Sequence, residues 1–410
     1  MPLILSHESV VTMPELLSPA GDFPSLMAAL KAGADAVYLG LEGCNMRARA
    51  GNFTVHEIEE AVERAHGYGA RLYVCTNTSL RDEDVERLEL ILPELHSAGV
   101  DAVIASDLAA VDLAADNGLD VHVSVQANIS NTRSLHVLKD MGVSRVILSR
   151  ELSLNEISGI ASSSPIEVEV FVHGALCTAL SGRCYLSSYL YGRSANCGEC
   201  LQPCRKKWRL VSEDGEFELE TDASGYIRTY LLSPRDLCMI EHIPELLDAG
   251  VSALKIEGRG RPADYVGTVT GVYREAVDRY LEGEWRFEER WLRELKKVFN
   301  RGLGKGFYFS EPEAGSPGNV SDYVKLDVGE VVNYYRKAGA AEVRLWRPLK
   351  LGDEIIIQGR TTGALIQRVE SIQVDGCSVE RVEDGHAGIL VSGRVREGDL
   401  VYRRVPRDRG

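Results

Sequence analysis

The first clear structural signal in the chain is ELLSPAGDFPSLMAALKAGADAVYLG (15–40). Its two ends, ELLS and AVYLG, are short apolar runs of the kind that form buried β-strands. Between them, the apolar residues of FPSLMAALKAGA recur at spacings of three and four, which indicates an amphipathic helix. A strand, a helix and a strand in this order predict a β–α–β unit with two parallel strands.

Similar apolar runs recur along the chain and alternate with helical patterns. They are RLYVC (71–75), AVIAS (102–106), VHVSV (121–125), RVILS (145–149), EVEVFV (167–172), TYLLS (229–233) and ALKIEG (253–258). Near-continuous apolar strands separated by helices indicate a parallel sheet that is buried on both faces. We expect a (β/α)8-like barrel domain over residues 1–300, with one strand candidate spurious or additional. An open doubly wound sheet is the alternative.

The chain changes character after residue 300. Residues 301–323 are rich in Gly and Pro and are predicted to form a linker. From residue 324 to 410, short β-runs such as VGEVVNYY, GDEIIIQG and GDLVYRR are separated by Gly and Asp turn signals. This pattern predicts a small all-β barrel as a second domain.

Composition narrows the classes of function. The chain has 410 residues and a net charge of −15, which argues against a protein coated for non-specific nucleic-acid binding. It has no apolar run of about eighteen residues, so no membrane span is expected. The first residues do not read as a signal peptide. We therefore expect a cytoplasmic protein, in a compartment where structural disulfides are rare. The oligomeric state is left open.

A (β/α)8 barrel places its chemistry where the strands end and the following loops begin. Polar side chains collect at these positions in the predicted barrel: Arg47, Arg49, Gln126, Asn128, Arg150, His173, Glu257 and Arg259. Each of them can equally cap a helix or form a salt bridge. Their shared position at one end of the barrel makes them candidate site residues.

Five of the nine cysteines fall in CTALSGRCYLSSYLYGRSANCGECLQPC (177–204), directly after the EVEVFV strand. We expect a cysteine-rich insertion over residues 177–238 at the catalytic end of the barrel. The spacing is C-x6-C, then fifteen residues, then C-x3-C. Four thiolates suit either zinc or a [4Fe–4S] cluster, and the spacing alone leaves both open. His173 lies four residues before Cys177, so a Cys–His nucleophile pair is a further alternative.

The stretch EVFVHGALCTALSGRCYLSS (169–188) resembles the signature of the U32 family, historically named peptidase U32 or collagenase-like. VSVQANISN (123–131), CLQPCR (200–205) and LKIEGRGRPADYV (254–266) extend the resemblance over most of the predicted barrel. The C-terminal part resembles the second-domain β-barrel of translation elongation factors.

The resemblance implies an oxygen-independent hydroxylase. One branch of the family hydroxylates a wobble uridine of tRNA, with prephenate implicated as the hydroxyl source. Another branch acts on a cytidine of ribosomal RNA, and a third acts on the ubiquinone ring. A C-x6-C-x15-C-x3-C pattern is associated in the family with a [4Fe–4S] cluster. In this chain the pattern falls on Cys177, Cys184, Cys200 and Cys204, with Cys238 or Cys197 as candidate substitutes. The resemblance therefore favours the cluster over zinc.

On this basis we expect an RNA-base hydroxylase, with tRNA favoured as the partner. Arginine binds carboxylates in bidentate fashion, so Arg47, Arg49, Arg150 and Arg259 are candidates to bind a small carboxylate co-substrate. His173 or Glu257 could move protons. The segment RKKWR (205–209) contains Lys207 and Trp208, a cation and an aromatic ring that suit RNA phosphates and bases.

Three alternatives differ in class. They are a U32-type peptidase, a hydroxylase of another ring substrate, and a noncatalytic RNA-binding protein that carries a cluster or zinc. The peptidase requires a Cys–His pair, whereas the noncatalytic protein requires a metal site without a cavity beside it.

Overall fold

The computed structural model describes residues 13–43, 45–46, 51–206, 232–316 and 318–408. Four predicted site residues lie outside these ranges: Arg47, Arg49, Lys207 and Trp208. Most of the strand candidate at 229–233 also lies outside them. Among the described residues, no helix is both long enough and apolar enough to cross a membrane.

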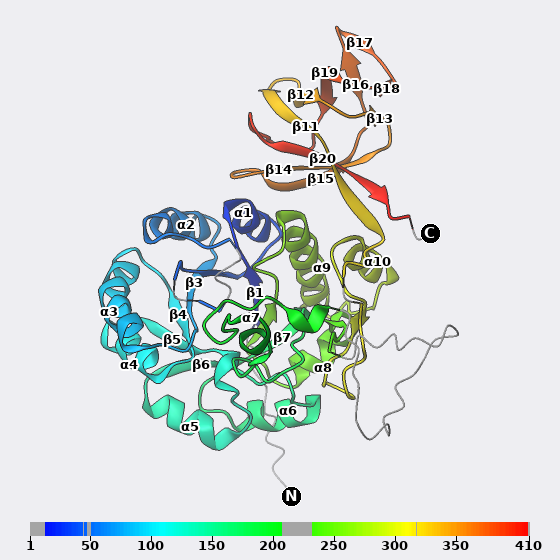
Figure 1. Cartoon of the computed structure of the whole chain (residues 1–410). Helices are drawn as coiled ribbons and strands as arrows, with labels where there is room; N and C mark the ends of the chain where they lie inside the picture. The colour runs from blue at the N-terminus through cyan, green and yellow to red at the C-terminus, as the bar shows by residue number, and fades with distance from the viewer. Residues whose placement is uncertain (1–12, 44, 47–50, 207–231, 317, 409–410) are drawn as a thin grey trace, which may run out of the picture.

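Eight parallel strands close into a barrel, as the sequence predicts (Figure 1). They are β1 (Glu15–Pro19), β2 (Ala36–Gly40), β3 (Arg71–Thr76), β4 (Ala102–Ala105), β5 (Asp120–Val123), β6 (Val143–Ile147), β7 (Glu167–Gly174) and β9 (Ala253–Ile256). Each of β1 to β6 pairs with the next strand along the chain, and β9 pairs with both β7 and β1. These last two pairings close the sheet, so the open doubly wound alternative is wrong.

Helices surround the barrel in a ring (Figure 1). They are α1 (Phe23–Lys31), α2 (Val55–Gly67), α3 (Asp82–Ser97), α4 (Leu108–Asp116), α5 (Thr132–Asp140), α6 (Leu154–Ser163), α8 (Ile243–Asp248) and α9 (Ala263–Leu281), with α10 (Glu289–Lys297) beyond. The N-cap Asp22 fixes the start of α1, because its carboxylate accepts a hydrogen bond of 2.8 Å from the backbone N–H of Ser25. The apolar faces of strands and helices form one continuous buried core.

The ninth strand in chain order, β8 (Asp236–Cys238), does not belong to the barrel. It pairs antiparallel with the carboxyl end of β7, through His173 with Cys238 and Gly174 with Leu237. The short strand β10 (Leu303–Gly304), which lies within the predicted linker, pairs with β8. Together β8 and β10 extend the sheet beyond the barrel end at which the candidate site residues collect.

The C-terminal part is all-β, as predicted, and its described strands pair antiparallel. Its larger sheet contains β11 (Tyr323–Tyr335), β12 (Ala340–Leu345), β14 (Glu354–Gly359), β15 (Gly363–Arg368), β16 (Ile372–Val374), β17 (Cys377–Ser378), β19 (Gly385–Leu390) and β20 (Leu400–Pro406). A second sheet pairs β13 (Leu349–Lys350) with β18 (Arg381–Val382). Val328, Ile355 and Val401 are fully buried in a core that is separate from that of the barrel.

This C-terminal part packs against α1, α2 and α9, beside the barrel wall (Figure 1). Lys31 of α1 donates to the backbone carbonyl of Thr362 at 2.9 Å. The guanidinium of Arg360 lies 3.5 Å from the ring centroid of Phe23 and pairs with Glu60 at 2.6 Å. The contacts fix the second domain to the outside of the barrel and leave the carboxyl ends of the strands uncovered by it.

Candidate functional site

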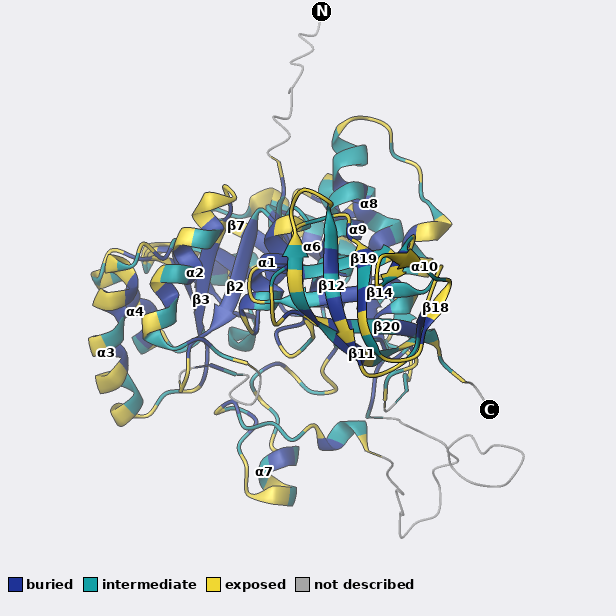
Figure 2. Ribbon diagram, turned by 90° about the horizontal axis from the view of Figure 1, so that it is seen from above, coloured by how far each residue is buried: buried dark blue, intermediate teal, exposed yellow. Residues whose placement is uncertain are grey.

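The cysteine segment (175–206) follows β7 and crosses the carboxyl end of the barrel, where α7 (Leu186–Tyr191) stands away from the strands (Figure 2). Asn128, in the left-handed backbone region, ties this segment to the barrel. Its Nδ2 donates at 2.8 Å to the carbonyls of both Gln126 and Ser181. Asn128 was predicted to bind substrate, but it is not among the residues that line the cavity beneath the segment.

A cavity of about 120 Å³ lies between the barrel strands and the cysteine segment, and we call it the barrel cavity. The strands and their following loops contribute Tyr38, Asn77, Gln126, Phe171, Lys255, Glu257 and Arg259. The cysteine segment contributes Cys177, Cys184, Cys200 and Cys204. The structure thus brings thiols, amides and charged groups from distant parts of the chain to one hollow.

The four cavity thiols are those that the family resemblance marks as ligands. Burial raises the pKa of the Cys204 thiol, and Cys177, Cys200 and Cys184 act in the same direction against the opposing charge of Arg205. All four are free of disulfides. Four neighbouring thiolates form a donor set that fits zinc or a [4Fe–4S] cluster. Within the described residues, however, no three His, Cys, Asp or Glu side chains are already arranged around a metal position.

The two candidate substitutes lie elsewhere. Cys197 is exposed and does not line the barrel cavity. Cys238 is buried on β8, and burial raises the pKa of its thiol. It also does not line the cavity.

Amide groups occupy one side of the barrel cavity. The Nδ2 of Asn77 donates to Ser124 Oγ at 3.0 Å and to Gln126 Oε1 at 3.1 Å. Arg259 is 4% exposed, and its Nη1 donates to Asn45 Oδ1 at 2.9 Å. Gln126 and Arg259, both predicted as binding residues, therefore line the cavity with fixed orientations.

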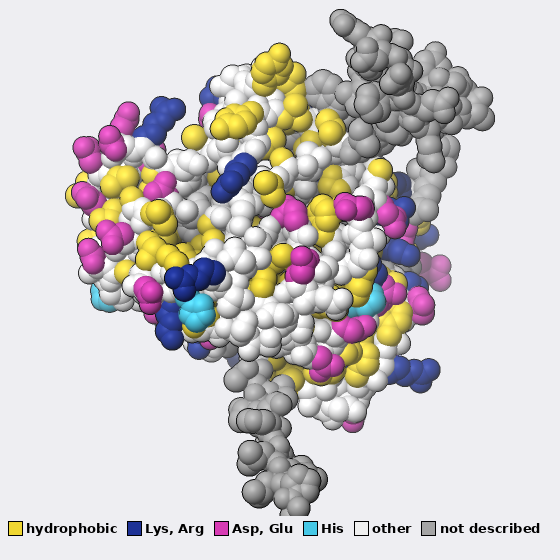
Figure 3. Space-filling view, turned by 90° about the horizontal axis from the view of Figure 1, so that it is seen from below, with side chains coloured by type: hydrophobic (Ala, Val, Ile, Leu, Met, Phe, Trp, Pro, Cys, Tyr) yellow, Lys and Arg dark blue, Asp and Glu magenta, His cyan; other side chains and the backbone are white. Residues whose placement is uncertain are grey.

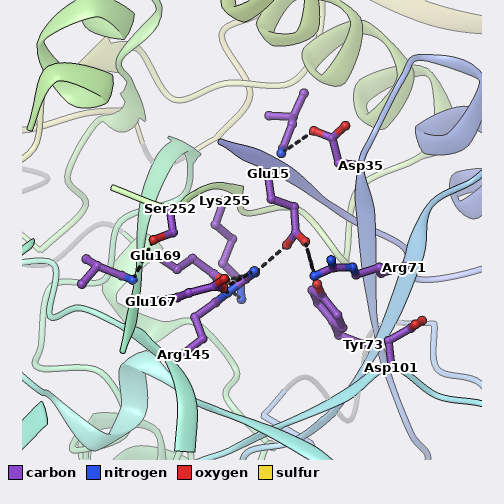
Figure 4. A network of polar contacts seen from close by, with 12 residues as sticks. Glu15, Asp35, Arg71, Tyr73, Asp101, Arg145, Glu167, Glu169, Ser252 and Lys255 are labelled. Atoms are coloured by element: carbon purple, nitrogen blue, oxygen red, sulfur yellow. Dashed lines mark hydrogen bonds and ion pairs between the residues drawn. The ribbon is translucent and has the colours of Figure 1, made fainter. Parts of the chain in front are cut away.

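Lys255 also lines the barrel cavity, and sequence reasoning missed it. Its Nζ lies 2.8 Å from Glu169 Oε1, and both side chains are buried. Glu169 also pairs with Arg145, at 3.4 Å (Figure 4). The guanidinium of Arg145 forms two further ion pairs, with Glu167 at 2.7 Å and with Glu15 at 2.5 Å. Buried charges are tolerated when they are paired in this way, so the network holds the Lys255 ammonium in a fixed position in the cavity lining.

A second cavity of about 290 Å³ lies against three of these cysteines, Cys177, Cys200 and Cys204, and we call it the arginine cavity. Four guanidinium groups line it: Arg150, Arg205, Arg261 and Arg301. Arg150 was predicted to bind a carboxylate, and Arg205 was predicted only as part of the RKKWR segment; Arg261 and Arg301 were not predicted. Arg150 pairs with Glu257 at 3.7 Å, and Arg301 pairs with Asp236 at 3.2 Å.

Arg261 shows why the arginine cavity suits an anion. Its guanidinium lies 3.4 Å from the centroid of the Phe299 ring. Burial lowers the pKa of Arg261, and the nearby charge of Arg301 acts in the same direction. Adjacent guanidinium groups in a partly enclosed space favour a bound oxyanion, such as a carboxylate.

Glu257 lines both cavities, and its side chain is 15% exposed. His173, the other predicted proton-transfer residue, lies on β7 with 2% exposure. Its Nδ1 is 3.4 Å from the Tyr273 hydroxyl, and burial lowers its pKa to about 3. It lines neither cavity. Of the two predicted groups, Glu257 is therefore the one placed to exchange a proton with a bound molecule.

A closed (β/α)8 barrel with its polar cavity at the carboxyl ends of the strands defines the class of this protein as a TIM barrel, the fold in which enzymes carry their active sites at that end. The model of peptidase family U32 matches residues 21–317. The chain belongs to this family.

Its relatives carry two kinds of name. A Methanocaldococcus jannaschii protein named an uncharacterized protease is 47% identical over 96% of this chain and 98% of its own length. A Porphyromonas gingivalis protein named collagenase is 38% identical over 95% of this chain and 97% of its own length. A Bacillus subtilis protein named tRNA hydroxylation protein P1 is 37% identical over 90% of this chain and 89% of its own length.

Proposed function

We propose that this chain is an oxygen-independent hydroxylase that modifies an RNA base, with a tRNA wobble uridine as the favoured substrate. The observation that carries the proposal is the shared lining of the barrel cavity. Four thiols that can hold a redox group face the same hollow as the amides of Asn77 and Gln126 and the carboxylate of Glu257. The relative named a tRNA hydroxylation protein supports RNA as the substrate class.

Cys177, Cys184, Cys200 and Cys204 would hold a [4Fe–4S] cluster, with zinc as the alternative occupant. Such a cluster, when bound, supplies one-electron redox chemistry. The neighbouring Cys197 and Cys238 stand apart from the cavity and are left out of the proposed ligand set.

The remaining residues of the barrel cavity would bind the RNA base, orient it and exchange a proton with it. An RNA base must leave its stack to reach such an interior cavity, and it is then read through its hydrogen-bonding edge. Gln126 would offer its Nε2 to that edge, because its Oε1 is already held by Asn77 Nδ2 at 3.1 Å. Tyr38 and Phe171, which also line the cavity, would cover the ring faces of the base. Glu257 would accept or return the proton that the ring must exchange.

The arginine cavity would bind the hydroxyl donor, a small carboxylate of the prephenate type. In the described part of the chain, neither Arg261 nor Arg205 forms an ion pair with a carboxylate. Because Arg205 already donates to Ser233 Oγ at 2.8 Å and to the carbonyl of Pro234 at 3.0 Å, Arg261 would be the main partner for a carboxylate of the ligand. Arg150 and Glu257 line both cavities and would orient the donor relative to the base.

A peptidase is the second candidate, favoured by the relatives named protease and collagenase. A cysteine nucleophile requires a paired base. His173 is buried beside Tyr273 rather than at the cavity that Cys177 lines, so the described geometry offers no such pair between these two residues.

The test is mass spectrometry of nucleosides from RNA of a host that lacks its own RNA hydroxylation genes. Cells that express the wild-type chain should contain a uridine with the mass of one added oxygen. Glu257→Gln should abolish that product, whereas Glu284→Gln, an exposed change remote from both cavities, should not. Absence of the product from all RNA, together with cleavage of a collagen peptide by the wild type, would establish the peptidase instead.

A further inference from the structure

The cysteine segment exposes large aromatic side chains at the barrel mouth. Tyr185 is 74% exposed and Tyr189 is 88% exposed, at the start and within α7. The backbone N–H of Tyr189 donates to the carbonyl of Tyr185 at 2.8 Å, so the two residues are one helical turn apart. Side chains at this spacing lie on the same face of a helix. We call this pair the tyrosine platform.

The tyrosine platform borders the barrel cavity. Tyr185 lies between Cys184 and Leu186, and both of these neighbours line that cavity. Figure 2 shows α7 clear of the barrel body, and in the view from below (Figure 3) hydrophobic side chains project at the same end of the molecule. Exposed apolar surface of this kind beside a site indicates a place where a partner binds.

The charge of the segment identifies the kind of partner. Residues 177–206 contain four cations, Arg183, Arg193, Arg205 and Lys206, and the single acidic residue Glu199, a net charge of +3. Arg205 lines the arginine cavity and Arg193 pairs with Glu199 at 2.8 Å, which leaves the exposed Arg183 and Lys206 for a partner. The whole chain carries −15. Lys206 also lies 4.8 Å from the ring centroid of Tyr191. Cations interleaved with exposed aromatic rings match the phosphates and bases of a single-stranded nucleic acid.

Building on the proposed function, we propose that the tyrosine platform stacks the unpaired RNA nucleotides that flank the target base. The exposed Arg183 and Lys206 pair with their phosphates. The stacked neighbours would hold the strand at the cavity mouth while the target base enters. Because stacking tolerates any base, the platform binds unpaired strands in general, and selection of the base is left to the cavity.

The experiment measures fluorescence anisotropy of the full-length protein with two labelled RNAs. One is a stem–loop with an unpaired loop, and the other is a fully paired duplex of the same length. Tyr185→Ala/Tyr189→Ala should weaken stem–loop binding by about tenfold or more, because the variant loses both rings on which the bases would stack. Tyr185→Phe/Tyr189→Phe, which keeps both rings, should bind within about twofold of wild type, well below that stacking effect.

Tyr68→Ala is the matched control, because Tyr68 is 51% exposed next to α2, away from the cysteine segment. It should leave binding unchanged. Wild-type affinity in the double alanine variant would overturn the platform while leaving RNA hydroxylation intact. An equal loss of stem–loop affinity in the double phenylalanine and double alanine variants would also overturn the proposal, because stacking on the rings would then not explain the binding. If the wild-type chain binds neither RNA, the platform and the proposed function both fail.

Discussion

At the scale of single residues, the interior of this barrel is held by charges as well as by apolar side chains. Glu169 is fully buried and pairs with both Lys255 and Arg145, and Lys255 in turn lines the barrel cavity. These residues stand singly in runs that read as apolar strands, such as RVILS and ALKI. The sequence predicts the strands correctly, but it does not reveal the pairing because the partners are distant along the chain.

Glu169→Gln should lower the free energy of unfolding by about 3–5 kcal/mol, because it leaves buried cations without their compensating charge. Urea unfolding followed by circular dichroism measures the change. Glu167→Gln is the matched control: Glu167 also pairs with Arg145, but its side chain is 52% exposed. Glu167→Gln should lower the free energy of unfolding by less than about 1 kcal/mol. An equal decrease in the free energy of unfolding for the two variants would contradict the claim that burial makes the Glu169 charge essential.

Buried histidines should make the protein sensitive to acid. Burial lowers the pKa of His173 to about 3 and that of His122 well below its ordinary value. In the unfolded chain both would titrate near pH 6.5. As pH falls from about 6.5 towards 3, the unfolded state therefore binds protons that the folded state does not, and stability is lost over that window.

His173→Gln should make the loss of stability between pH about 6.5 and 4 shallower by up to about 1.4 kcal/mol per pH unit. Denaturant midpoints measured across this range give the slope. An unchanged slope in the variant would show that His173 titrates normally in the folded protein.

At the scale of elements, the alternation of apolar strands and helices was sufficient to predict the barrel, since each β–α–β unit is local in sequence. The antiparallel strand β8 was not predicted as such, because its partner β7 is separated from it by the whole cysteine segment. The arginine cavity was missed for a similar reason. Arg205, Arg261 and Arg301 come from three segments that are far apart along the chain, and nothing local in sequence indicates that they meet.

The end of β7 depends on Gly174, whose φ is +106°. A side chain there would overlap the backbone of Glu257. Gly174→Ala should therefore displace Glu257 together with its carboxylate and abolish formation of the hydroxylated nucleoside. Gly192→Ala is the control, because Gly192 also has a positive φ of +65° but nothing within 4 Å of the added carbon. It should cost about 1 kcal/mol in stability and retain activity. Full activity of Gly174→Ala, measured by nucleoside mass spectrometry, would contradict the role of Glu257.

At the scale of the whole molecule, the all-β part is fixed to the barrel wall by ion pairs from α9. Asp264 lies 2.8 Å from Lys325 and 4.0 Å from Arg404. Arg404 is also paired with Glu354 at 2.6 Å. The sequence predicted the fold class of the barrel and the all-β class of the C-terminal part correctly. It did not predict which helices the second domain covers, because these contacts join residues far apart in the chain.

Asp264→Asn should weaken this attachment by about 1.5–3 kcal/mol, the range for a hydrogen bond to a charged group. Hydrogen exchange should then rise at α9 and β20 while the strands of the barrel stay protected. Asp384→Asn, at an exposed position, should leave exchange unchanged. Unaltered exchange at α9 in the Asp264 variant would show that the ion pairs do not hold the two parts together.

The most direct measurement is iron, sulfide and zinc content of the protein purified without oxygen, for the wild type and two variants. The four cavity thiols predict about four irons and four sulfides per chain, loss of that content in Cys200→Ser, and its retention in Cys197→Ser. Cys197 is the matched control because it lies in the same segment but outside the cavity lining. Full metal content in Cys200→Ser, or none in the wild type, would contradict the proposed redox site.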